Sequence, residues 1–178
     1  LIPNMAPTQF RIMKACLESE GYKVEILGNC GSQVAQLGLK YVHNDTCYPA
    51  QLAIGQLIDA LESDKSLDLD KVALMMTQTG GGCRASNYIY LLRKALDKCG
   101  YEQIPVVSVT FMKNEQSPGF SLPVSMVLQL YYGVMFGDLI MLLNNQCLPY
   151  EINKGDTQRA VDDSVAWAED ILSKHKLL

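Results

Sequence analysis

Two cysteines stand beside the segments in which an α/β protein usually carries its chemistry. Cys83 ends the run TQTGGGC at residues 77–83, which follows the apolar stretch 72–76 and precedes a helical pattern. Cys47 lies in the run HNDTCYP at residues 43–49, again just before a helical pattern. Open α/β sheets bind their ligands at the carboxyl ends of the strands, so thiolates at two such turns could meet at one metal ion or cluster. We therefore expect Cys47 and Cys83 to share a site.

The position of both cysteines before a helix favours the thiolate form. The free backbone N–H groups and the dipole at a helix N-terminus lower the pKa of a thiol placed there. Cys47 comes two residues before Pro49, a residue that suits the first helical turn, and Cys83 lies at a comparable point. His43 and Asp45 are close enough in sequence to tune Cys47 by hydrogen bonding. A histidine bonded only within its own loop fits the sequence equally well.

The three glycines before Cys83 have three explanations, which the sequence leaves open. Gly80, Gly81 and Gly82 would let the backbone approach a bulky cluster held by Cys83. Their N–H groups could instead cradle a phosphate at the helix N-terminus, although the spacings typical of nucleotide loops are missing. They could also form a tight strand-to-helix turn in which the thiol is incidental. Arg84, which follows Cys83, would either balance the charge of an anionic cluster or reach into solvent.

Four further cysteines have different contexts. Cys30 follows a strand-like segment and precedes a glycine, which makes it the candidate for a third metal ligand at the same sheet edge. Cys16 and Cys99 occupy apolar-compatible positions in helical patterns and are expected to be core thiols. Cys147 follows a long helical pattern and is expected to be structural. No CxxC pair is present, which argues against a zinc ribbon, and a core of this size needs no disulfides. These features favour a reducing cytoplasm.

The hydrophobic patterns predict alternating helices and strands. Helical periodicity covers residues 7–20, a segment that starts at Pro49, residues 85–99, residues 122–144 (as a buried helix pair or a kinked helix) and residues 157–174. Residues 23–27 alternate like a short strand, whereas 72–76 and 104–109 are continuously apolar, as in strands covered on both faces. Residues 30–41 are expected to be a loop with one helical turn, and 114–119 a turn-rich loop.

This order of elements predicts an α/β fold with a parallel sheet and right-handed crossovers. We expect a three-layer, doubly wound parallel sheet, resembling half of a Rossmann or flavodoxin fold, with C-terminal helices. Residues 1–120 would form the cluster-binding core. Residues 121–178 would form a helical extension packed on the same domain.

Composition limits the classes of function. The chain has 178 residues, of which 48% are hydrophobic and 19% charged, as in an ordinary soluble domain. Its net charge of −4 argues against nucleic acid as a partner. No uninterrupted apolar run of about 20 residues is present, so we expect no membrane span. The first residues, LIPNM, include neither an initiator Met nor a signal-peptide pattern, and we expect the chain to be a fragment of a longer protein.

Two long motifs make the chain similar to a known family. Residues 40–50, KYVHNDTCYPA, and residues 76–88, MTQTGGGCRASNY, resemble the large proteins related to 2-hydroxyacyl-CoA dehydratase activators. These are the CoA-substrate-specific enzyme activase-like proteins of anaerobes. Tyr132-Gly133, residues 136–139 (FGDL) and residues 149–151 (PYE) fit the same pattern, and the likeness extends over residues 3–167.

The resemblance implies an iron–sulfur function. Family members are similar to a fusion of an ATP-binding activator with dehydratase-subunit-like segments that hold a 4Fe-4S cluster through cysteines. This chain would belong to the dehydratase-like portion, because it has none of the glycine-rich ATPase motifs. Cys47 and Cys83 match cluster-ligand positions. A third ligand would be Cys30 or would lie outside the fragment, and we expect the isolated fragment to lose its cluster in air.

The expected function is therefore that of a metal-binding, 4Fe-4S electron-transfer module in an ATP-dependent CoA-enzyme activase, 2-hydroxyacyl-CoA dehydratase-like. It would handle low-potential electrons, with the ATPase portion of the parent chain or a partner subunit as its partner. The alternative is a non-catalytic regulatory or assembly domain whose loops bind a partner subunit or an acyl-CoA phosphate.

Overall fold

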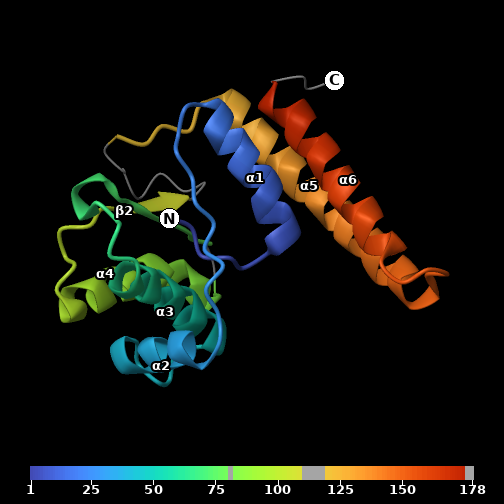
Figure 1. The fold of residues 1–178 in the computed structure, drawn as a ribbon. Coiled ribbons are helices and arrows are strands. Elements are labelled where there is room, and N and C mark those ends of the chain that lie inside the picture. Colours follow the sequence, from blue (N-terminus) through green and yellow to red (C-terminus); the bar gives the residue numbers. More distant parts are fainter. Residues whose placement is uncertain (80–81, 110–118, 175–178) are drawn as a thin grey trace. The chain divides into compact units, whose positions relative to one another are not determined.

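The chain forms two compact units in a computed structural model that describes residues 1–79, 82–109 and 119–174 (Figure 1). The first, here called the sheet unit, comprises residues 1–4 and 26–121. The second, the helical unit, comprises residues 5–25 and 122–178. Each unit therefore draws on segments that are far apart in the sequence.

The sheet unit contains a pair of parallel strands and three α-helices. Strand β1 (Leu74–Thr77) pairs with β2 (Val106–Val109), from Leu74 opposite Val106 to Thr77 opposite Val109. The helices are α2 (Ser32–Tyr41), α3 (Tyr48–Ser63) and α4 (Tyr88–Cys99), and short 3₁₀ helices cover Leu69–Lys71 and Arg84–Asn87. The carboxyl end of β1 thus leads directly into the segment that ends at Cys83.

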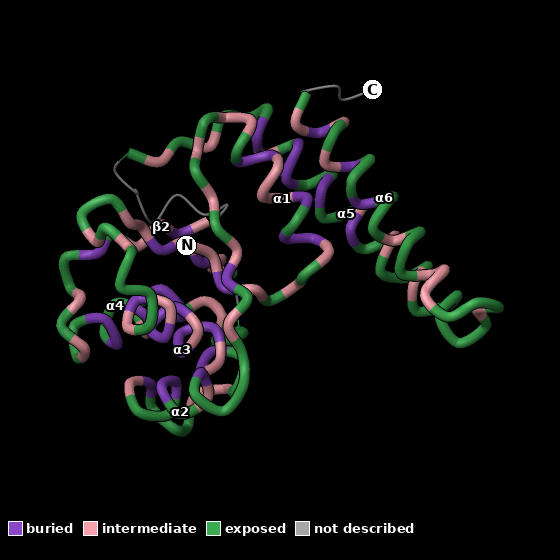
Figure 2. The backbone as a smooth tube through the Cα atoms, viewed as in Figure 1, coloured by how far each residue is buried: buried purple, intermediate pink, exposed green. Residues whose placement is uncertain are grey.

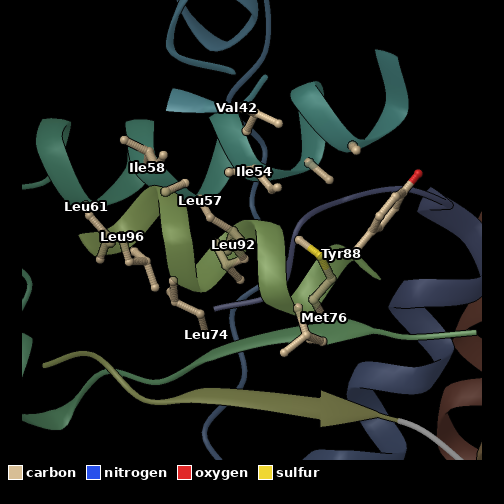
Figure 3. Packing of buried hydrophobic residues seen from close by; sticks show 14 of the residues in the cluster. Val42, Ile54, Leu57, Ile58, Leu61, Leu74, Met76, Tyr88, Leu92 and Leu96 are labelled. Atoms are coloured by element: carbon tan, nitrogen blue, oxygen red, sulfur yellow. The ribbon is translucent and has the colours of Figure 1, made fainter. Parts of the chain in front are cut away.

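The prediction of a three-layer, doubly wound parallel sheet is wrong. The described chain is mostly helical, and its strands are the parallel pair β1 and β2 in one small sheet. Residues 23–27 contribute an isolated parallel bridge between Ile26 and Ile2 instead of a strand. Figure 3 shows α3 and α4 stacked on one side of the strands. Apolar patterning reports burial, whereas a strand also needs a hydrogen-bonded neighbour along its length, and residues 23–27 obtain such pairing at a single point.

The core of the sheet unit lies between α3, α4 and β1 (Figures 2 and 3). Several of its large side chains are completely buried, namely Ile54, Leu57, Ile58, Leu74, Ile89 and Leu92. Burying a side chain of this size contributes roughly 1.5–3 kcal/mol, an upper estimate because the unfolded chain is already partly compact. This packing fixes α3 and α4, whose first turns lie next to the two candidate cysteines.

Helices α2 and α3 touch backbone to backbone through two glycines. A Cβ atom on Gly38 would overlap the backbone carbonyl of Gln51, and one on Gly55 would overlap that of Val34. Because the earlier residue of α2 meets the later residue of α3, the two helices run antiparallel. The short connection between them therefore brings the chain back to the start of α3, where Cys47 lies.

The helical unit is a bundle of α1 (Pro7–Ser19), α5 (Val124–Cys147) and α6 (Asp156–Ser173). Gly133 and Gly137 on α5 admit α1 closely, since their Cβ positions would meet Ile12 and Gln9. Gln9 donates a 2.7 Å hydrogen bond to Asp138 of α5. Between α5 and α6, the buried Gln129 donates to the carbonyl oxygen of Leu172 at 3.1 Å. Small residues and a few polar bonds therefore set the spacing of the bundle.

Helix α5 differs from the expected helix pair or kinked helix, because residues 124–147 form one helix. Its buried residues are few: Met126, Gln129, Leu130, Gly133 and Gly137. By length and composition the span Val124–Tyr150, with a mean hydropathy of 1.7, could cross a bilayer, a test that core helices of soluble proteins also pass. The expectation that the chain spans no membrane stays a prediction.

Candidate functional site

Cys47 caps the N-terminus of α3. Its backbone is extended (φ −59°, ψ 144°), and its carbonyl oxygen accepts the amide N–H of Ala50 at 3.0 Å, so the first helical turn starts directly after it. Pro49 lies in that first turn, as the sequence suggests. Cys47 is half-buried.

The loop before Cys47 is held by a buried glutamine on α3. The Nε2 atom of Gln51 lies 3.4, 3.3 and 3.2 Å from the carbonyl oxygens of His43, Asn44 and Thr46, and donates to them. Gln51 is 4% exposed, so its amide is committed to fixing this loop. His43 and Asp45 point away into solvent and interact with each other, with 3.4 Å between Nδ1 and Oδ2. The structure therefore assigns the positioning of Cys47 to Gln51.

Cys83 is exposed and caps the 3₁₀ helix Arg84–Asn87 that leads into α4. Its sulfur accepts a long hydrogen bond of 3.5 Å from the amide of Ala85. Ser86 donates its hydroxyl to the Cys83 carbonyl oxygen at 2.7 Å. Gln78, just beyond β1, donates to the Ser86 carbonyl oxygen at 2.6 Å and accepts from the Ser108 hydroxyl of β2 at 3.1 Å. Cys83 is thus tied to the carboxyl end of the parallel strands.

Tyr88 connects the two cysteine segments. It is the first residue of α4, is 7% exposed, and its hydroxyl lies 3.2 Å from the Cys47 sulfur. The contact with Tyr88 lowers the pKa of Cys47, and the backbone N–H of Ala50 and the charge of Arg84 act in the same direction. Burial, together with the neighbouring sulfurs of Cys47 and Cys83, raises the pKa of Tyr88 to about 12. The tyrosine therefore stays protonated at neutral pH and can donate to a Cys47 thiolate.

A cavity of about 310 Å³ lies at the same place. It is lined by residues of both cysteine segments, namely Thr46, Gly82, Cys83, Arg84, Ser86, Asn87 and Leu91. Apart from Leu91 and Gly82, these residues offer thiol, hydroxyl, amide or guanidinium groups. A larger cavity of about 640 Å³ belongs to the helical unit, and no predicted site residue lines it.

The other predicted site residues have different outcomes. Cys30 is exposed, and its neighbour Asn29 bonds to Gln56 and Asp59 of α3. These residues lie 9 and 12 positions beyond Cys47, or roughly 14–18 Å along a helix that rises about 1.5 Å per residue. The structure therefore does not bring Cys30 to Cys47. Gly80 and Gly81 lie outside the described residues, whereas Gly82 is exposed with open space around its Cα.

The remaining cysteines are distributed as follows. Cys16 is fully buried in α1, and burial raises its pKa to about 11. Cys99 is half-buried at the end of α4, and burial likewise raises its pKa to about 11. Cys147 is exposed at the end of α5 and lines the larger cavity.

The donor set fits part of an iron–sulfur site. Such clusters are held by cysteine thiolates, commonly four, and Cys47 and Cys83 supply two thiol groups close to N–H donors and a guanidinium. In residues 1–79, 82–109 and 119–174, no group of three or more His, Cys, Asp or Glu side chains is placed to hold a metal ion. A cluster at this site would therefore take further ligands from elsewhere.

No protein-family model, curated protein or solved structure matches this chain. The resemblance carried by the two cysteine motifs accordingly remains an expectation.

Sequence reasoning missed three residues that build the site. These residues are Tyr88, Gln51 and Gln78, for which the sequence predicts no role. A signal was present for the two glutamines, because each is a polar residue directly next to a cysteine loop or a strand end, where backbone groups need partners. Nothing in the sequence pattern pairs Tyr88 with Cys47, which is 41 residues away.

Proposed function

We propose that Cys47 and Cys83 are two ligands of a 4Fe-4S cluster, and that the chain is the cluster-binding portion of an ATP-dependent, 2-hydroxyacyl-CoA dehydratase-like activase. The observation that carries this proposal is that both cysteines cap helices beside Tyr88 and Arg84. Two thiolates in such surroundings are what a negatively charged cluster requires.

The chain's own residues have separate roles in this proposal. Cys47 and Cys83 hold iron, the amides of Ala50 and Ala85 and the guanidinium of Arg84 offset negative charge, and Tyr88 donates to the Cys47 sulfur. The cluster, when bound, supplies one-electron chemistry at low potential. ATP hydrolysis, and the ligands that complete the cluster, belong to the parent chain or to a partner subunit.

Anaerobic reconstitution with iron and sulfide tests the proposal. With dithiothreitol present to occupy the iron positions that lack a protein ligand, the wild-type chain is expected to develop broad visible absorption and to retain iron and sulfide after desalting, while Cys47→Ala and Cys83→Ala each lose both. Cys147→Ala is the matched control, because it removes an exposed thiol outside the site. Iron loading that is unchanged in Cys83→Ala would contradict the proposal.

The fold must survive for that comparison to be valid. Cys47→Ala and Cys83→Ala remove half-buried or exposed side chains and should hardly change the thermal midpoint. Cys16→Ser has the opposite profile: it places a hydroxyl in a fully buried position and should cost roughly 1–3 kcal/mol without affecting iron loading. Melts of the apo variants measure this contrast.

The alternative function is a non-catalytic regulatory or assembly domain. The polar lining of the 310 Å³ cavity, with Arg84, Ser86 and Asn87, favours an anionic group such as the phosphate of an acyl-CoA. Calorimetric titration of the metal-free Cys83→Ala variant with coenzyme A separates the two functions. Binding that persists in this variant and is lost in Arg84→Ala would support the alternative.

A further inference from the structure

Helix α5 presents an apolar face that neither α1 nor α6 covers. Ten large apolar side chains of this helix are between 37% and 76% exposed: Val124, Leu128, Tyr131, Tyr132, Val134, Met135, Leu139, Met141, Leu142 and Leu143. A tyrosine can bury about 150–250 Å², so ten half-exposed side chains of this kind present on the order of 800 Å². The largest apolar patch on a typical monomer is only about 300–600 Å². The α5 face therefore has the size of an interface.

The centre of this face is a stripe of five side chains: Leu128, Tyr131, Met135, Leu139 and Leu142. Their spacings of three and four residues place them on one side of a helix, opposite Gly133 and Gly137, which pack against α1. The spacing is also symmetric about Met135. The intervals are three and then four residues from Leu128 to Met135, and four and then three residues from Met135 to Leu142. A two-fold symmetric contact needs such a self-complementary pattern. When residue i of one copy contacts residue j of the other, residue j of the first copy also contacts residue i of the second.

The chemistry of the surroundings favours protein over lipid as the partner. Asp138 is the sole charged residue of α5, so the face offers no charge pattern for a charged partner. On the neighbouring α6, however, Asp162 and Glu169 pair with Arg11 of α1 at 3.2 and 3.4 Å. If α5 entered a bilayer, this charged cluster around Arg11 would have to enter the hydrocarbon layer on the same bundle, which is costly.

We propose that the α5 stripe is the interface of an antiparallel homodimer of this chain. Met135 lies on the two-fold axis, Tyr131 packs against Leu139 of the second copy, and Leu128 packs against its Leu142. The five stripe residues supply about half of the roughly 800 Å² estimated for the ten exposed side chains. The contact reaches the area of a standard stable interface, about 800 Å² per copy, when it also covers the flanking side chains such as Tyr132 and Leu143. This dimer does not depend on the cysteine site, so it stands or falls separately from the proposed function.

Sedimentation equilibrium of the 178-residue chain tests the dimer. We expect a dimer at micromolar concentration, and Met135→Glu should raise the dissociation constant by at least about 100-fold, because it places two carboxylates on the axis. Ile152→Glu is the matched control: it adds the same charge at a residue that is 95% exposed outside α5, and should leave the dimer intact. Unchanged helical circular dichroism in Met135→Glu would show that the bundle is folded.

Cross-linking tests the antiparallel arrangement. In a background with Cys30, Cys83 and Cys147 changed to Ser, Met135→Cys should form an intermolecular disulfide, whereas Leu128→Cys should not, because its counterpart faces Leu142. A chain that stays monomeric, a dimer that tolerates Met135→Glu, or efficient self-cross-linking of Leu128→Cys would each overturn the proposal. A monomer that binds neutral lipid vesicles through α5 would overturn it as well, and would assign the face to lipid.

Discussion

The Cys47–Tyr88 contact is the most specific interaction in the candidate site. Two side chains from different helices, 41 residues apart, approach to 3.2 Å, and one of them is almost fully buried. A hydroxyl that remains protonated next to a thiol with a lowered pKa acts as a donor to the thiolate. Tyr88 therefore favours the thiolate form of Cys47.

Replacing this tyrosine tests its effect on the thiol. Tyr88→Phe removes the donor, so the pKa of Cys47 should rise and its alkylation by iodoacetamide at pH 7 should slow several-fold. Mass spectrometry of the Cys47 peptide across a pH series measures the midpoint. Tyr90→Phe is the control, since Tyr90 is 61% exposed on the same helix. Identical pH profiles for Tyr88→Phe and the wild type would contradict the role assigned to Tyr88.

The same contact has a defined consequence for stability. A thiol whose pKa is lowered by folding stabilises the folded state above its unfolded pKa, and this contribution is lost as the pH falls through the folded value. Tyr88→Phe removes the part of this stability that depends on the ionisation of Cys47. It should therefore lower the melting temperature more at mildly alkaline pH than at pH 6.

At the scale of elements, the glycine contact between α2 and α3 determines where α3 begins. Gly38→Ala would force a Cβ into the Gln51 backbone, and since neither helix backbone can yield locally, the pair must separate. We expect a loss of about 1–3 kcal/mol or more in the free energy of unfolding, measured by urea denaturation. Gly28→Ala, where nothing lies within 4 Å, should change stability little. Equal effects of the two substitutions would show that the helices are not in backbone contact.

The carboxylate of Glu151, which precedes helix α6, caps the N-terminus of this helix. Glu151 accepts the amide N–H groups of Gly155 and Thr157 at 3.0 and 3.2 Å, and these bonds hold its pKa below the ordinary value of 4.5. A carboxylate with a lowered pKa contributes stability above its unfolded pKa, and the contribution disappears as the pH falls through the folded value. Glu151→Gln should therefore lower the melting temperature at pH 7 and have little effect in stronger acid. A loss of equal size at both pH values would contradict this account of the cap.

The positions of most helices could be predicted from the sequence, whereas the sheet could not. Apolar spacings of three and four residues predict α1, α4 and α6 to within a few residues, and Pro49 lies in the first turn of α3 as expected. The segment 30–41 was underestimated: α2 buries Val34, Leu37 and Gly38 at helical spacings of three and four residues, and Gly38 lies in backbone contact with Gln51 of α3. The segment 23–27 has the alternating pattern of a strand, but it pairs with the chain at a single point, the bridge between Ile26 and Ile2.

At the scale of the whole molecule, the position of each cysteine directly before a helix could be predicted, and the environment of the two cysteines could not. Cys47 and Cys83 were singled out because each precedes a helix, which is a local property. The contribution of Tyr88, the separation of Cys30 and the antiparallel α2–α3 pair depend on tertiary packing, which a single sequence does not encode in any short pattern. The apolar face of α5 was also read as buried, because composition alone does not show which helices are neighbours.

The central claim is that Cys47 and Cys83 hold one cluster together. The most direct measurement is the low-temperature electron paramagnetic resonance spectrum of the anaerobically reconstituted chain after reduction with dithionite. The account predicts a reduced 4Fe-4S signal in the wild type and in Cys147→Ala, and its loss in Cys47→Ala and in Cys83→Ala alike. A signal of full intensity in either of those two variants would contradict the claim that both cysteines are ligands.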